Sequence, residues 1–237
     1  MRKLTFLLFS TVAFLCSFYT SAQSKGKMSL EDIMNFSKNK VDVSKIPDQY
    51  AFSWKYTMQI TTDKGKNFET DYFLHPNAGY YGANMKEKKK NQMFMVMDTK
   101  RKIMISTFGD GDKKNAMASN LPDYSKLANE NSTKFTYKSV PGKEILGYKC
   151  KGMQAVNDKM TVTFYYTTSA KVSFAEMFQM GKNNTPDVFK GYFKSGEKPL
   201  SLEVIYTDLA KNKTTTMKCI ALEKEAYTFK KADYKFM

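Results

Sequence analysis

Apolar and polar side chains alternate along most of the chain, and the alternation is clearest in residues 51–62. One set of alternate positions is apolar and the other is polar: Phe52, Trp54, Tyr56, Met58 and Ile60 against Ser53, Lys55, Thr57 and Gln59. Successive side chains of a strand point to opposite faces, so this pattern predicts a half-buried antiparallel strand. The polar run at residues 63–66 predicts a hairpin turn into a second strand over residues 68–74.

Residues 92–107 predict a second hairpin, with methionine along one face. One side of its first strand carries methionines and the other carries bulky apolar residues: Met93, Met95 and Met97 against Phe94 and Val96. Residues 98–101 form a polar break typical of a turn, and residues 102–105 resume an apolar run. Because both faces are apolar, we expect both to be covered.

The pairing within this hairpin depends on the length of its loop. A loop with an even number of residues places Met95 opposite Met104 and Val96 opposite Ile103, whereas an odd number shifts the pairing by one residue. Methionine adapts to irregular apolar partners, so the stripe suits either ordinary core packing or a ligand-lining surface. Of these two interpretations, the pattern favours ordinary core.

The rest of the chain predicts about ten strands in all, mostly in hairpin order, with short helices between them. A connection of more than 20 residues is expected after Phe108, and a turn is expected at Pro141 and Gly142. Two short amphipathic helices are predicted at residues 29–39 and 173–180, with apolar stripes formed by Leu30, Ile33 and Met34 and by Phe174, Met177 and Phe178. The fold class is therefore α+β but mainly β: a curved antiparallel sheet that forms an unclosed half β-barrel.

The first 22 residues have the features of a secretory signal peptide. Arg2 and Lys3 form a basic start, residues 4–18 are apolar, and small residues precede a cleavage site after Ala22. We expect the mature protein to be exported to the periplasm or the extracellular space. The remaining chain divides into an N-terminal helical segment, residues 23–46, and one β domain, residues 47–237.

The formal net charge of +15 comes almost entirely from lysine, because Arg2 and Arg101 are the only arginines among 38 basic residues. Arginine would be expected to dominate a surface built for bidentate phosphate recognition. The charge suits solubility and protection of strand edges, and it could also draw the protein to an anionic membrane surface. The export signal argues against a nucleic-acid partner.

No sequence motif specifies a reaction, a cofactor or a metal. The single histidine, His75, precedes a proline, so neither a Ser-His-Asp triad nor a multi-histidine metal site is predicted; a carboxylate-based site stays open. Methionine thioethers suit Cu(I), but no histidine accompanies them, and no metal site is predicted. The mature chain has two cysteines, Cys150 and Cys219. Export favours a disulfide between them, whereas the strand order of a simple meander argues against it.

Four segments resemble a family of secreted Bacteroidota domains of unknown function (DUF4412-type): IPDQYAFSWKYTMQI, MFMVMDTKRKIMI, EILGYKCKGM and ADYKFM. That family is grouped with the outer-membrane lipoprotein carrier LolA, in which an unclosed antiparallel barrel wraps an apolar cavity under short lid helices. The resemblance implies the same LolA-like architecture here. It implies a ligand-lining set of Phe52, Trp54, Tyr56, Met58, Met93, Met95, Met97 and Met104, and a lid set of Leu30, Ile33, Met34, Phe174, Met177 and Phe178.

The function that follows as an expectation is binding or carriage of a lipid or of the acyl chain of a lipoprotein. The alternative is a structural or interaction module of the envelope whose core is filled and which binds no ligand. The resemblance carries over no catalytic residue, because the family has no settled activity.

Overall fold

The computed structural model describes residues 40–85, 93–108, 114–121, 135–174 and 199–237. The predicted signal peptide and the predicted helix at residues 29–39 lie outside these ranges. The strands are β1 (Gln49–Thr61), β2 (Asn67–Leu74), β3 (Tyr80–Met85), β4 (Met93–Asp98), β5 (Ile103–Phe108), β6 (Asn115–Asn120), β7 (Thr136–Ile145), β8 (Tyr148–Val156), β9 (Met160–Thr167), β10 (Leu200–Asp208), β11 (Lys213–Lys230) and β12 (Lys235–Phe236). Two single-turn 3-10 helices, η1 (Val43–Lys45) and η2 (Lys231–Asp233), precede β1 and β12.

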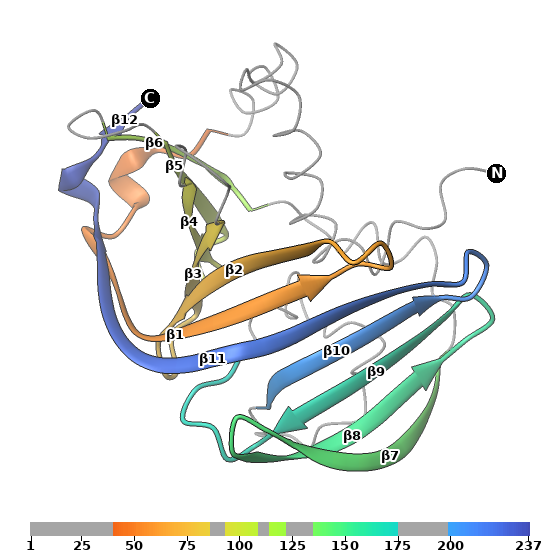
Figure 1. The fold of residues 1–237 in the computed structure, drawn as a ribbon. Coiled ribbons are helices and arrows are strands. Elements are labelled where there is room, and N and C mark those ends of the chain that lie inside the picture. The colour runs from red at the N-terminus through yellow and green to blue at the C-terminus, as the bar shows by residue number, and fades with distance from the viewer. Residues whose placement is uncertain (1–39, 86–92, 109–113, 122–134, 175–198) are drawn as a thin grey trace.

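The described strands form one open, curved sheet of twelve strands in the order β12-β6-β5-β4-β3-β2-β1-β11-β10-β9-β8-β7 (Figure 1). The predicted fold class, a mainly β chain built on a curved antiparallel sheet, is confirmed. Every neighbouring pair is antiparallel except β12 and β6, which are parallel. The sheet thus consists of two meanders, β1–β6 and β7–β11, which join where β1 pairs with β11.

Strand β11 bends strongly and carries the chain back towards the other edge of the sheet (Figure 1). Its pairing with β1 shifts register twice, between Phe52 and Trp54 and between Thr57 and Met58. Such bulges bend a strand and increase its twist. After η2, β12 reaches the far edge and pairs with β6, so the first meander curls around the end of β11.

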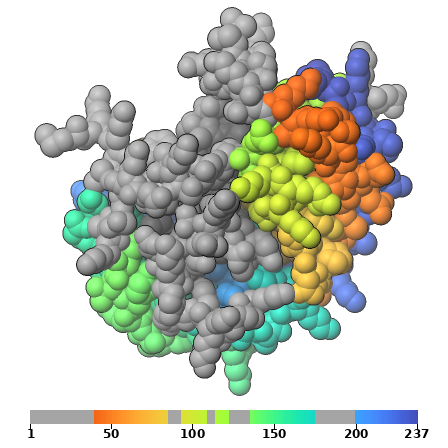
Figure 2. Space-filling view, turned by 180° about the vertical axis from the view of Figure 1, so that it is seen from behind, coloured from red at the N-terminus to blue at the C-terminus, as the bar shows by residue number. Residues whose placement is uncertain are grey.

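The first described residues lie against the C-terminal end of β11. The Lys231 amide donates to the Asp48 carbonyl at 2.8 Å, and the Lys231 ammonium donates to the Ile46 carbonyl at 3.1 Å. Figure 2 shows these N-terminal residues (orange) beside the C-terminal residues (blue) on one side of the molecule. Residues more than 180 positions apart are therefore neighbours.

The methionine hairpin forms as β4 and β5, but its register differs from the prediction. Met97 pairs with Met104 and Val96 pairs with Ile105. The predicted pairing of Met95 with Met104 is wrong by two residues, because β4 continues through Asp98 and the loop occupies residues 99–102. A shift of two keeps each side chain on its face, so the methionine face is preserved.

Two further expectations are corrected. The long connection after Phe108 contains β6, whose short run of small residues carries too few large apolar positions for its alternation to be recognised. The turn expected at Pro141 and Gly142 is instead a bulge within β7, and the chain turns at Leu146 and Gly147. Both turn residues have positive φ, at 52° and 77°. Proline is tolerated in β7 because this strand is an edge of the sheet.

Both faces of the first meander are buried, as expected from the apolar residues on both sides of the methionine hairpin. Neighbouring residues of β2, β4 and β5 contribute to different clusters. We call the first cluster's part on β1–β5 the methionine face; its buried members are Tyr56, Met58, Ile60, Tyr72, Leu74, Tyr81, Ala83, Met95, Met97 and Met104. We call the other cluster the second core; it consists of Val41, Ile46, Tyr50, Phe52, Phe73, Phe94, Val96, Ile103, Ile105, Ala116, Ala118 and Phe229.

Candidate functional site

The methionine face brings together the strand positions that the sequence marked as candidates for lining a ligand site. Met58, Met95, Met97 and Met104 are each 5% exposed or less. Strand pairing places Tyr81 beside Met97 and Tyr56 beside Tyr72 on the same face. The face therefore combines polarisable thioethers with flat aromatic rings, which suits an apolar partner of irregular shape.

Phe174 lies outside the sheet and packs its aromatic ring on this face. Its ring lies 5.6 Å from the ring of Tyr56, 4.8 Å from that of Tyr72 and 5.2 Å from that of Tyr81, each in an edge-on arrangement. It is 3% exposed and belongs to the same cluster as the methionines. The segment after β9 thus covers the methionine face with an aromatic side chain, and the role of Phe174 as a lid stays a prediction.

The remaining members of the predicted lid lie outside the described residues. Leu30, Ile33 and Met34 belong to residues 1–39, and Met177 and Phe178 belong to residues 175–198. Their role as a lid stays a prediction.

Trp54 and Met93 are partly buried and pack against the cluster that contains the methionine face. Trp54 pairs with Leu74 across β1 and β2, so its indole lies on the same face as Tyr56. Of the predicted lining residues, these two have more contact with solvent than the methionines at the centre.

Phe52 is the lining residue that the sequence placed wrongly. Its ring packs in the second core, 6.2 Å from Phe73 and 6.1 Å from Phe94, and it stacks on Tyr227 at 6.1 Å. Phe73 points away from the methionine face, since it is flanked by Tyr72 and Leu74. Strict alternation would place Phe52 and Trp54 on the same face of β1. The register shift between them bends the strand, and Phe52 therefore packs in the second core.

Cys150 and Cys219 are both free thiols and both buried in the cluster that includes the methionine face. The structure therefore does not contain the disulfide that export favours. Two strands, β9 and β10, separate β8 from β11 in the sheet. Each thiol donates to a carbonyl of its own strand, Cys150 to Tyr148 at 3.4 Å and Cys219 to Ala221 at 3.3 Å.

Electrostatics in the cluster that includes the methionine face favour neutral groups. Burial raises the pKa of Cys219 from 9.0 to about 12, and burial also raises the pKa of Cys150. Burial raises the pKa of Tyr56 well above its usual value, and its hydroxyl donates to the Ser201 carbonyl at 2.6 Å. At neutral pH these groups therefore carry no charge, which is the condition for holding an uncharged hydrocarbon.

A charged pair borders the same cluster on the second meander. The Lys143 ammonium forms an ion pair with Glu203, whose side chain is 8% exposed, and lies 3.9 Å from the centre of the Tyr165 ring. Tyr165 packs against the cluster of the methionine face. The pair satisfies a carboxylate that would otherwise be buried without a partner.

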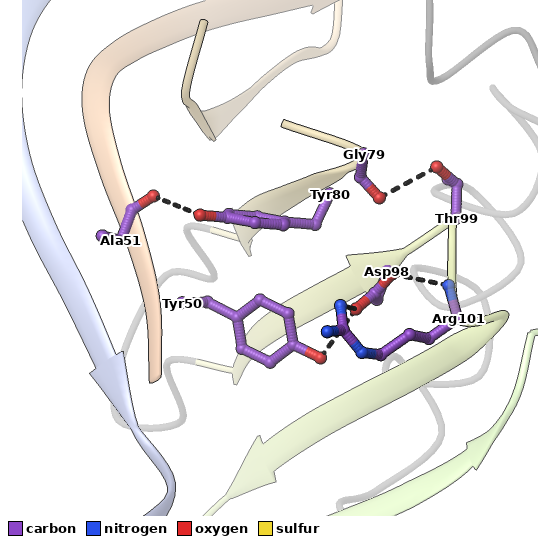
Figure 3. Close-up of polar contacts among 7 residues, drawn as sticks. All are labelled: Tyr50, Ala51, Gly79, Tyr80, Asp98, Thr99 and Arg101. Carbon is purple, nitrogen blue, oxygen red and sulfur yellow. Dashed lines mark hydrogen bonds and ion pairs between the residues drawn. The ribbon is translucent and has the colours of Figure 1, made fainter. Parts of the chain in front are cut away.

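Asp98 forms a polar network that the sequence did not reveal (Figure 3). Its carboxylate is 1% exposed and accepts hydrogen bonds from the Tyr50 hydroxyl at 3.0 Å, from the Arg101 amide at 2.8 Å and from the Arg101 guanidinium at 3.1 Å. The network closes the turn of the methionine hairpin and anchors it to β1. The available signal was an aspartate at the start of a turn that also contains Arg101, the chain's second arginine.

Across the described ranges, no group of three or more His, Cys, Asp or Glu side chains is placed so that it could hold a metal ion. In the same part of the chain, no helix has the length and apolar character needed to cross a membrane.

Comparison with known proteins gives no family. No protein-family model matches the chain, and no curated protein matches it. Solved structures with similarity include PNGF-II, with 12% identity and a TM-score of 0.43 over 78% of this chain and 31% of that chain. The chain therefore spans less than a third of the length of PNGF-II.

Two other similar structures match over most of both chains. An uncharacterized conserved protein from Thermus thermophilus has 10% identity and a TM-score of 0.41, over 84% of this chain and 88% of that chain. A domain from Vibrio parahaemolyticus, described as an outer membrane lipoprotein-sorting protein, has 6% identity and a TM-score of 0.20, over 83% and 92%. With scores this low, the fold is defined by the chain's own strand order, and membership of the secreted Bacteroidota family stays a prediction.

Proposed function

We propose that this chain is an exported protein of the cell envelope that binds an apolar ligand on the methionine face. The ligand class is a hydrocarbon chain, from a lipid or from the acyl group of a lipoprotein. The observation that carries the proposal is the position of Phe174, a side chain from outside the sheet that packs on Tyr56, Tyr72 and Tyr81. An acyl chain would take the place of this ring and contact the same tyrosines and the methionines beside them.

The chemistry of the face supports this exchange. Thioether side chains have several rotatable bonds and adapt to partners of different shape. Tyrosine rings offer large apolar surface at low entropy cost. The predicted signal peptide supplies the compartment in which such a ligand would be met. Release of Phe174 would expose apolar surface that binding of the acyl chain would cover again, so the exchange is close to balanced in buried area.

A second candidate function is supported by one observation. The central members of the methionine face are 5% exposed or less, as in a finished core. A structural module of the envelope would have such a face permanently covered by its own chain. The two candidates differ in whether an added acyl chain can reach the face.

Trp54 allows a direct test, since it is the only tryptophan and packs at the border of the methionine face. The mature protein, freed of bound lipid, is titrated with a brominated fatty acid, which quenches indole fluorescence on contact. We expect the emission of Trp54 to fall in a saturable manner, and we expect the unbrominated fatty acid to have no such effect.

A matched control places the reporter in the second core. In the double variant Trp54→Phe/Tyr227→Trp, the indole replaces the partly buried ring that packs against Phe52. We expect its emission to be insensitive to the brominated chain. Equal quenching of both reporters, or of neither, would contradict a site on the methionine face, and absence of quenching in both would favour the filled module.

A further inference from the structure

Three hairpin turns lie together at one end of the sheet. The turn between β1 and β2 occupies residues 62–66, that between β8 and β9 occupies residues 157–159, and that between β10 and β11 occupies residues 209–212. Strand pairing aligns them, because Thr61 pairs with Thr216, and Asp208 pairs with both Lys213 and Met160. All three appear on the right of Figure 1. We call residues 62–66, 157–159 and 208–213 the hairpin rim.

The hairpin rim is held together by contacts between the turns. The Leu209 amide donates to the Lys159 carbonyl at 2.9 Å, which ties the third turn to the second. The Lys213 ammonium lies 3.8 Å from the Asp63 carboxylate, which ties the third turn to the first. The Asn157 side chain accepts from the amides of Lys159 and Met160 at 2.8 and 2.9 Å. The rim is therefore a preformed surface.

The hairpin rim combines an excess of lysines with an exposed apolar side chain. Leu209 is 47% exposed at the tip of its turn. Five lysines lie on the rim, Lys64, Lys66, Lys159, Lys211 and Lys213, against three carboxylates, Asp63, Asp158 and Asp208. The Asp208 side chain is only 8% exposed and forms an ion pair with Lys211 at 3.2 Å. The outward-facing charge is thus positive, around an exposed apolar side chain.

We propose that the hairpin rim docks on an anionic lipid bilayer, with Leu209 inserted at the boundary between head groups and acyl chains. Lysines near a negatively charged leaflet are attracted to it, and an apolar side chain among them gains by leaving water. A hydrophilic polyanion offers the first of these gains but not the second, so the exposed leucine favours a bilayer. This inference goes beyond the proposed ligand site and does not rest on it.

The opposite end of the sheet provides an internal comparison. Leu146, at the turn between β7 and β8, is 46% exposed, almost the same as Leu209. Its neighbourhood is balanced in charge, because Glu144 pairs with Lys149 across the strands and Lys143 forms an ion pair with Glu203. Among the described hairpin turns, Leu146 and Leu209 are both exposed at a tip, and Leu209 is the one within a positive surface.

The test is flotation of the mature protein with vesicles of phosphatidylcholine that contain phosphatidylglycerol, against vesicles of phosphatidylcholine alone. We expect binding to the anionic vesicles at low salt and its loss as salt is raised. The variant Lys64→Gln/Lys66→Gln/Lys159→Gln should bind about fivefold more weakly for each lysine removed. Within the described part of the chain, these three lysines make no ion pair with the rim's carboxylates that would be lost on substitution.

Serine variants of the two leucines distinguish insertion into the bilayer from attraction by charge alone. We expect Leu209→Ser to weaken vesicle binding several-fold and Leu146→Ser to leave it unchanged, with thermal unfolding confirming that both variants fold. Three results would overturn the proposal: equal binding to neutral and anionic vesicles, equal effects of the two serine variants, or no binding at all. Within the second of these results, loss of binding with the lysine variant but with neither serine variant would show attachment by charge alone, without insertion of Leu209. Quenching of Trp54 by brominated fatty acid should be the same in all these variants, so the two proposals can fail separately.

Discussion

Replacement of Phe174 by alanine would remove the aromatic ring that covers the methionine face. The ring is 3% exposed and makes three edge-on contacts, with Tyr56, Tyr72 and Tyr81. Truncation of a buried phenylalanine costs about 3–5 kcal/mol, including the cavity that it leaves. Each aromatic pair contributes about 0.5–1.5 kcal/mol beyond the area that it buries. We therefore expect the free energy of unfolding to fall by about 3–4 kcal/mol.

Urea denaturation followed by the fluorescence of Trp54 measures this loss. A domain with the usual stability of about 5–15 kcal/mol stays folded after it. If an acyl chain takes the place of the ring, a fatty acid at about 100 times its Kd restores about 2.7 kcal/mol to the Phe174→Ala variant. Wild-type protein should gain less, because its own ring must first leave the face.

Phe94→Ala is the matched control, since Phe94 is a buried phenylalanine of the second core, 8% exposed. It should lose a similar stability but gain nothing from the fatty acid beyond what wild type gains. A loss of less than about 1 kcal/mol in Phe174→Ala would show that the ring is not packed as described. Equal stabilisation of the two variants by the fatty acid would refute the exchange on the methionine face.

Three further predictions concern the fold. Asp98→Ala removes the acceptor of the Tyr50 hydroxyl and the Arg101 amide, and should lower the unfolding free energy by about 3 kcal/mol in urea denaturation; a loss near zero would show that these donors find water instead. Leu146→Asn should raise the free energy of unfolding by about 1 kcal/mol and raise Tm, because leucine at φ 52° is strained and asparagine tolerates this conformation; an unchanged or lower Tm would contradict this. Burial raises the pKa of Cys219 from 9.0 to about 12, so folding favours the protonated thiol. Its contribution to stability is complete below pH 9 and is lost as the pH rises towards 12. The urea midpoint should therefore fall less steeply above pH 9 in Cys219→Val than in wild type, and parallel curves would refute the assignment.

Local alternation predicted the strands of the first meander well. The strands at residues 51–62 and 68–74 and the methionine hairpin appear within one or two residues of their predicted bounds. Apart from Phe52, their side chains also sort by face as expected, because alternation in a strand depends only on the backbone. The prediction failed at two places, each for a local reason. The small side chains of β6 give no clear alternation, and Pro141 and Gly142 predicted a turn although the chain turns at Leu146.

The sequence predicted which face of each strand the candidate site residues occupy, but not which of these faces come together in one surface. Met58, Met95, Met97 and Met104 were identified from their positions in the alternation, and they do share one cluster. Phe52 was assigned to the same surface by the same rule and belongs to the second core. Strict alternation assumes a regular strand. The pairing of β1 with β11 contains two bulges, and a bulge changes which face the following side chains occupy.

The amino-acid sequence by itself determined that this chain is mainly β and that both faces of its methionine hairpin are apolar. These properties depend on the order of neighbouring residues, because successive side chains of a strand point to opposite faces. Tertiary structure alone decided that β11 joins two meanders, which three tyrosines Phe174 contacts, and that three hairpin turns form one rim. Each of these joins residues far apart in the chain, and such contacts depend on how the whole sheet bends and closes rather than on any local pattern.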